Sequence, residues 1–130
     1  MFEITKQFHF EAGHWLNGLP EGHKCGRYHG HSYRVRITLA SPELDATGFV
    51  ADFGDLAPVN ALLKARLDHQ TLNDLLDQPS SELLAQWIFQ QCQKVLPPAV
   101  AGLVTQVAVS ETATSWALYR EHPSEPDGSV

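Results

Sequence analysis

Two segments in the first third of the chain alternate apolar and polar residues, as strands with one buried face do. The first covers residues 2–12, and its apolar face consists of Phe2, Ile4, Phe8, Phe10 and Ala12. The second covers residues 31–40, and its apolar face consists of Tyr33, Val35, Ile37 and Leu39. Residues 15–30 between them are rich in glycine and polar side chains, which predicts a loop.

Two segments in the middle of the chain space their apolar residues by three and four, which predicts amphipathic helices. The first begins near Asp52 or Asp55, either of which can cap it, and its stripe is Leu56, Val59, Leu62, Leu63 and Leu67. The second follows a cap at Ser80 and ends before the proline pair at 97–98. Its stripe is Leu84, Trp87, Ile88, Cys92 and Val95.

The last third of the chain returns to the strand pattern at residues 103–109 and 115–120. Residues 122–130 are polar and rich in proline, glycine and serine, so we expect a disordered tail after a single domain at 1–121. The order ββααββ predicts an α+β fold with a four-stranded antiparallel sheet and two helices on one face.

Composition narrows the class of protein. A chain of 130 residues suits one domain, and its net charge of −6 argues against binding nucleic acid or an anionic membrane surface. No stretch approaches the roughly 18 apolar residues of a membrane helix, and no signal peptide is apparent. Two cysteines, Cys25 in a polar motif and Cys92 on a helix stripe, do not form a disulfide framework. We therefore expect a cytoplasmic protein.

Four polar residues stand at strand ends on the face otherwise given to apolar side chains: His14, His29, His31 and Glu111. A buried polar group is costly unless it is paired or bound to a metal. A lone histidine there would be interpreted as a hydrogen-bonded core residue. The His-x-His pair with a third histidine instead predicts zinc, because imidazoles are common zinc ligands and three of them leave a catalytic position open.

Cys25 stands four residues before His29, between Lys24 and Arg27. Cationic neighbours favour the thiolate, which is the reactive form of cysteine. Cys25 is thus a candidate catalytic group, although as a fourth zinc ligand it would instead close a structural Cys-His₃ site.

Two further acidic positions leave alternatives open. Asp68 and His69 follow the first helix, and they are either a helix C-terminus with a favourable imidazole or an oriented acid/base pair. Glu111 is either salt-bridged at the sheet edge or holds a heterocycle through adjacent N–H donors. From the residues alone, the chain is a zinc-dependent enzyme or a metal-binding α+β domain.

The motifs resemble those of the 6-pyruvoyl-tetrahydropterin synthase and 6-carboxytetrahydropterin synthase family over residues 2–120. The matching segments are Phe10-Glu11-Ala12-Gly13-His14, Glu21-Gly22-His23-Lys24-Cys25-Gly26-Arg27-Tyr28-His29-Gly30-His31, Asp52-Phe53, Leu67-Asp68-His69, Pro79-Ser80-Ser81-Glu82 and Ser110-Glu111-Thr112. The resemblance implies a tunnelling fold, in which sheets join around an oligomeric barrel. It also implies a homo-oligomer, commonly a hexamer of two trimers with sites at subunit interfaces. Gly13 departs from the Ala or Ser common before the first ligand.

Mapped by motif, the resemblance implies roles for individual residues. It makes His14, His29 and His31 the ligands of one Zn²⁺ per subunit. The implied catalytic residues are Cys25 as general base, Asp68 and His69 as a relay pair, and Glu111 as pterin anchor and relay member. The implied substrate-binding set is Glu111, Thr112, Lys24 and Arg27, the two cations holding a triphosphate.

The implied substrate is 7,8-dihydroneopterin triphosphate, and the implied products are 6-carboxy-5,6,7,8-tetrahydropterin, acetaldehyde and triphosphate, on the route to queuosine. The short gap between Cys25 and His29 resembles the bacterial carboxy-forming branch. One alternative is the 6-pyruvoyl-tetrahydropterin synthase reaction. An alternative of another class is a non-catalytic zinc-binding assembly protein.

Overall fold

The computed structural model describes residues 1–121, so the predicted tail at 122–130 lies outside the described residues. Within the described part, every helix is too short or too polar to cross a membrane.

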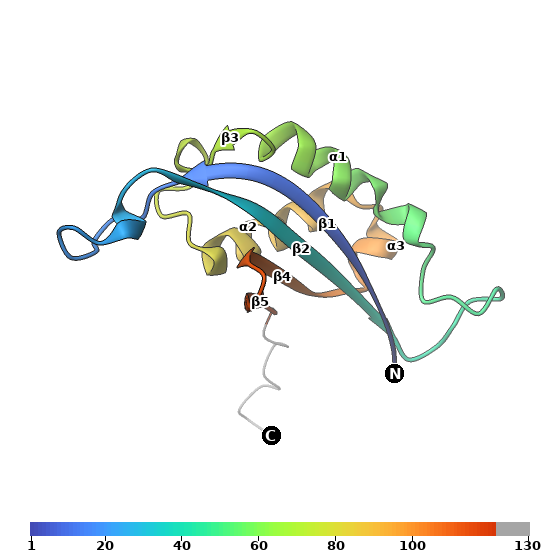
Figure 1. Ribbon diagram of the computed structural model, residues 1–130. Helices are drawn as coiled ribbons and strands as arrows, with labels where there is room; N and C mark the ends of the chain where they lie inside the picture. The colour runs from blue at the N-terminus through green and yellow to red at the C-terminus, as the bar shows by residue number, and fades with distance from the viewer. Residues whose placement is uncertain (122–130) are drawn as a thin grey trace, which may run out of the picture.

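The two predicted N-terminal strands form one long antiparallel pair. β1 (Phe2–His14) and β2 (His29–Ser41) pair along their whole lengths, from Phe2 opposite Ser41 to His14 opposite His29. They form the curved arch that spans the molecule in Figure 1. β2 begins two residues earlier than the pattern predicted, because its pairing with β1 continues through the glycine at 30.

The sheet has five strands in the order β3-β1-β2-β4-β5. β4 (Val104–Thr112) and β5 (Ser115–Tyr119) are the predicted C-terminal strands, each antiparallel to its neighbours. The predicted four-stranded antiparallel sheet is wrong in one respect, because β3 (Gln70–Thr71) adds a strand parallel to β1. Two residues are too few to carry a periodicity, so the sequence pattern gave no sign of β3.

Both predicted helices are present. α1 (Ala57–Arg66) follows a 3₁₀ turn, η2 (Phe53–Leu56), which the Asp52 carboxylate caps by accepting a hydrogen bond from the Gly54 amide. α2 (Ser81–Val95) is capped by Ser80, whose Oγ accepts a hydrogen bond from the Leu83 amide.

Short helical pieces add to these two helices. α3 (Pro98–Ala101) follows α2 directly, because proline fits the first turn of a helix even though it ends the preceding one. Single 3₁₀ turns occur at η1 (Lys24–Gly26) and η3 (Leu72–Asp74).

The core lies between the helices and one face of the sheet, as Figure 1 shows. The apolar faces of β2 and α2 supply fully buried side chains, among them Tyr33, Val35, Ile37, Leu39, Leu84, Ile88 and Cys92. Burial raises the pKa of the Cys92 thiol to about 12, so this cysteine is a packing residue. The opposite face is polar, and there the Arg36 guanidinium stacks on the Trp116 ring at 4.2 Å.

Candidate metal centre

Three histidine side chains converge where β1 ends and β2 begins. His14 pairs directly with His29, and His31 lies two residues further along β2 on the same face. One nitrogen from each ring lies within 4.8 Å of the other two, and the ring centroids are 4.6 to 5.1 Å apart. The strand period puts His29 and His31 on one face of β2, and the antiparallel register brings His14 of β1 beside them.

Backbone carbonyls fix two of these rings. Nδ1 of His14 lies 2.8 Å from the carbonyl oxygen of Pro79, and Nδ1 of His29 lies 2.6 Å from that of Arg27. A carbonyl oxygen only accepts, so each Nδ1 carries the proton and donates it. Each Nε2 is then unprotonated and carries a lone pair, as in metal sites whose histidines are oriented by an outer hydrogen bond. The Tyr33 hydroxyl lies 3.4 Å from Nε2 of His14.

The third ring leaves a buried nitrogen without a partner. Within residues 1–121, Nε2 of His31 is the buried side-chain polar atom that lacks a hydrogen bond. Burial also lowers the pKa of both His14 and His31, which keeps these imidazoles in the neutral form that binds metals. An orphaned nitrogen beside two pre-oriented imidazoles fits a divalent cation, and these three histidines are the residues that would hold it.

Glu111 borders the three histidines from the end of β4. Its Oε2 lies 3.5 Å from Nε2 of His31, and its Oε1 lies 3.9 Å from Nε2 of His14. Oε1 also accepts a 2.7 Å hydrogen bond from the Ser81 hydroxyl. Glu111 and its neighbour Thr112 line an open cavity of about 520 Å³ between β4, β5 and the start of α2.

Cys25 lies in η1, in the segment that joins β1 to β2. Its side chain is half-buried, and it is not part of the group of donor atoms formed by the three histidines. The turn is held by the Leu16 amide, which donates to the Cys25 carbonyl, and by His23, whose Nδ1 accepts from the Cys25 amide. Lys24 and Arg27 flank the cysteine as exposed side chains.

Asp68 and His69 lie beside Glu11 of β1, directly before β3 in the chain. Oδ1 of Asp68 accepts a hydrogen bond from the Glu11 amide at 2.9 Å, and Oδ2 lies 3.7 Å from Nε2 of His69 and from Nζ of Lys64. The Glu11 amide contributes most to lowering the pKa of Asp68, with the charges of His69 and Lys64 adding to it. His69 has a φ of 59°, which is unusual for a non-glycine residue and accompanies the bond from its amide to the Glu11 carbonyl.

His69 shares a cavity with one of the histidines of the metal centre. The cavity has a volume of about 420 Å³, and both His31 and His69 line it. The structure therefore places His69 beside the same cavity as His31, and neither Asp68 nor His69 belongs to the group of three histidines.

Comparison with known proteins decides the family. The model of the 6-pyruvoyl tetrahydropterin synthase family matches residues 3–122. This chain belongs to that family. A 6-carboxy-5,6,7,8-tetrahydropterin synthase from Synechocystis is 45% identical over 92% of this chain and 93% of its own length. One from Bacillus subtilis is 36% identical over 92% of this chain and 85% of its own length.

The fold of this synthase-family chain also matches a solved structure. The 6-pyruvoyl tetrahydropterin synthase of Caenorhabditis elegans superposes with a TM-score of 0.81, covering 93% of this chain and 96% of that one at 23% identity. The α+β fold expected from the order of strands and helices is thus confirmed, with the fifth strand as its correction.

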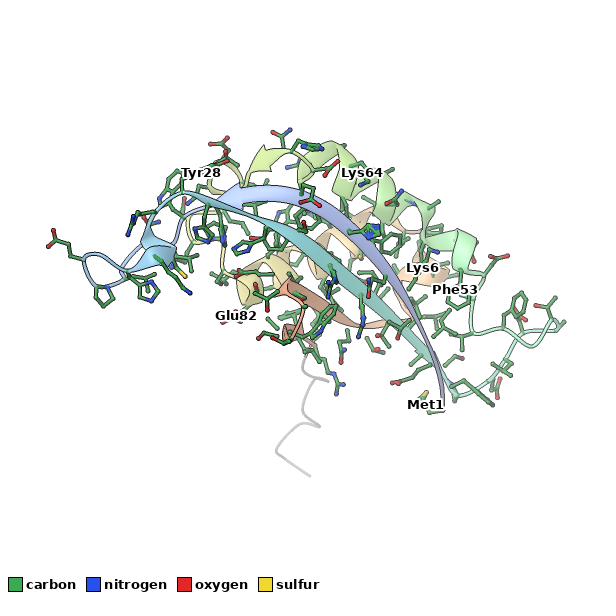
Figure 2. The ribbon with its side chains drawn as sticks, viewed as in Figure 1. Met1, Lys6, Tyr28, Phe53, Lys64 and Glu82 are labelled. Atoms are coloured by element: carbon green, nitrogen blue, oxygen red, sulfur yellow. The ribbon has the colours of Figure 1, made fainter. Side chains whose placement is uncertain are left out.

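One contact in this family member was not predicted. The Tyr28 ring lies over Gly13, where a β-carbon would collide with the phenol, and its hydroxyl hydrogen-bonds Thr71 Oγ1 at 3.2 Å. Figure 2 shows Tyr28 at the end of the arch far from Met1. The only sign in the sequence was glycine where the family commonly has Ala or Ser. Pro79 and Ser81 were likewise not assigned to the site, because backbone and hydroxyl contacts leave no spacing pattern.

Proposed function

We propose that this protein converts 7,8-dihydroneopterin triphosphate and water to 6-carboxy-5,6,7,8-tetrahydropterin, acetaldehyde and triphosphate, a step toward queuosine. The observation that carries the proposal is the group of three imidazoles with the Glu111 carboxylate 3.5 Å from His31. Support comes from the relatives at 45% and 36% identity, both of which are named for the carboxy-forming activity.

We propose zinc as the metal held by His14, His29 and His31, since a set of neutral imidazoles suits it. When bound, zinc supplies a Lewis acid that makes nearby hydroxyl and carbon-bound protons easier to remove. The carbonyl groups of Pro79 and Arg27 would keep two of the rings oriented for this.

Glu111 would anchor the pterin ring. A carboxylate accepts two adjacent N–H groups of a heterocycle through charge-assisted hydrogen bonds. One oxygen already accepts from Ser81, so Oε2 is the oxygen with the larger free capacity. Thr112, which lines the same cavity, would contribute to this pocket.

Proton transfer would fall to Cys25, Asp68 and His69. The Cys25 thiolate would remove a proton from the substrate side chain, and His69 would exchange protons as that side chain is cut. Asp68, which is held by the Glu11 amide, would keep a negative charge beside His69. Lys24 and Arg27 are exposed cations that would hold the triphosphate.

Two further parts of the proposal concern the oligomeric state and the cellular location. The family resemblance supports a homo-oligomer, a hexamer of two trimers closing a barrel, in which neighbouring copies complete each site. Cysteines that are not paired with each other suit the reducing cytoplasm, where we place the reaction. Size-exclusion chromatography with light scattering tests the oligomer directly.

The decisive experiment incubates zinc-loaded protein with 7,8-dihydroneopterin triphosphate and identifies the products by mass spectrometry. We expect 6-carboxytetrahydropterin and acetaldehyde in equal amounts. Release of triphosphate together with 6-pyruvoyl-tetrahydropterin, without acetaldehyde, would indicate the 6-pyruvoyl reaction instead. Intact substrate after long incubation would indicate a non-catalytic zinc-binding protein, and His29→Ala serves as the metal-free control.

A further inference from the structure

A three-residue corner before and at the start of α2 contacts both halves of the site. The carbonyl oxygen of Pro79 accepts from Nδ1 of His14 at 2.8 Å, and the hydroxyl of Ser81 donates to Oε1 of Glu111 at 2.7 Å. One metal ligand and the neighbouring carboxylate are therefore both attached to residues that stand two positions apart in the chain.

The corner is held in place by the helix that it begins. Between the two contacts, Ser80 caps α2: its Oγ accepts from the Leu83 amide at 3.2 Å and its carbonyl accepts from the Leu84 amide at 2.9 Å. Its own amide donates to the carbonyl of Gln78. Pro79 is buried and has a fixed φ. The corner thus has little freedom to move relative to α2.

The Ser81 hydroxyl distinguishes the two oxygens of Glu111. Oε1 is committed to Ser81, while Oε2 is directed toward the histidines, 3.5 Å from Nε2 of His31. The Glu111 side chain is 27% exposed, so solvent can reach it. Without the hydroxyl, the carboxylate could rotate toward solvent.

We propose that Ser81 is a positioning residue, which holds Glu111 by Oε1 so that Oε2 stays beside the metal centre to accept the pterin. The inference rests on the proposed function, because it assigns a role within the same site. Ser81 acts through Glu111 in this proposal and makes no contact of its own with the substrate.

The adjacent serines provide a matched pair of variants. Ser81→Ala removes the hydroxyl that holds Glu111, and we expect KM for the dihydropterin to rise about tenfold, with kcat within about twofold. Ser80→Ala removes the helix cap instead, so it should lower Tm and raise KM by much less than Ser81→Ala does. Ser81→Thr keeps a hydroxyl and should restore KM.

A double-mutant cycle separates positioning from direct contact. If Ser81 acts only through Glu111, adding Ser81→Ala to Glu111→Ala should have no further effect on KM. If the two effects add, Ser81 touches the substrate itself and the proposal is wrong. Equal rises in KM for Ser80→Ala and Ser81→Ala would also overturn it, because they would reflect a shared loss of the helix end.

A binding measurement tests the role of Ser81 independently of whether the proposed reaction takes place. Titration of zinc-loaded protein with neopterin, followed by pterin fluorescence, should give a Kd about tenfold weaker for Ser81→Ala, with zinc content unchanged. Neopterin binding without turnover by the wild type would contradict the proposed reaction and leave the Ser81 comparison intact. Identical Kd values for wild type and Ser81→Ala would contradict the positioning role alone, and no binding by the wild type would overturn both.

Discussion

The imidazole of His14 and the backbone carbonyl of Pro79 are joined by a 2.8 Å hydrogen bond across 65 positions of sequence. This bond assigns the proton of His14 to Nδ1 and directs Nε2 toward His29 and His31. The orientation of this buried ring is thereby fixed by a residue far away in the chain, and not by its own strand.

Metal affinity should depend on His31, whose buried Nε2 has no hydrogen-bond partner within the described residues. We expect His31→Ala to weaken zinc binding by more than about 100-fold, because loss of a ligand exceeds the effect of losing an outer hydrogen bond. His9→Ala, on the exposed face of the same sheet, should bind zinc as the wild type does. Chelator competition measures both affinities, and equal values would remove His31 from the ligand set.

Cys25 offers a test of catalysis without loss of metal. We expect Cys25→Ala to retain zinc and to lower kcat by about 10² to 10⁴, the range for removing a general base. Zinc content per chain and steady-state turnover are measured on the same preparation. If zinc and activity disappear together, the thiol is a fourth ligand, and the site is closed and structural.

Acid stability should report the contacts of Asp68. Its pKa in the folded protein lies below the ordinary 3.8, chiefly because of the Glu11 amide. The ionised carboxylate therefore stabilises the fold fully above pH 3.8 and loses this contribution as the pH falls through the lower folded value. The difference in unfolding free energy between wild type and Asp68→Asn, from urea titrations, should shrink below about pH 4. A difference that is constant with pH would contradict this.

The effects on stability of substitutions at Gly13 and at Tyr28 should depend on each other. A β-carbon at position 13 would collide with the phenol ring, so we expect Gly13→Ala to destabilise the protein by about 1–3 kcal/mol. Tyr28→Ala removes the obstacle, and the double variant should be more stable than the sum of the single changes predicts. Thermal unfolding of all four proteins measures this, and simple additivity would mean that the ring moves aside without cost.

Periodicity predicted much of this site for a physical reason. His14, His29 and His31 share the parity of buried strand positions, so the alternation itself placed them on one face. Glu111 was likewise placed at a strand end, and it lies beside them. The shared face of these histidines was predictable because the strand period is a local property that the sequence carries directly, whereas the pairing of His14 with His29 depends on the register between two strands.

Contacts that depend on tertiary packing could not be predicted. β3 pairs with Ala12 and Gly13 through two residues without any apolar pattern, and its place follows from how the chain leaves α1. The bond between Asp68 and the Glu11 amide spans 57 positions, and a backbone donor has no signature in the sequence. α3 was missed because proline was interpreted only as a helix stop.

The capped start of α2 has a consequence for local dynamics. Helix ends open more readily than helix centres, so the amides of Leu83 and Leu84, which bond to Ser80, should exchange with solvent before the hydrogen-bonded amides further along α2. The same opening would release His14 from Pro79, so a cation bound by the three imidazoles should slow deuterium uptake at these two amides. Slower deuterium uptake at the start of α2 would then report metal occupancy, although the cation does not contact this helix.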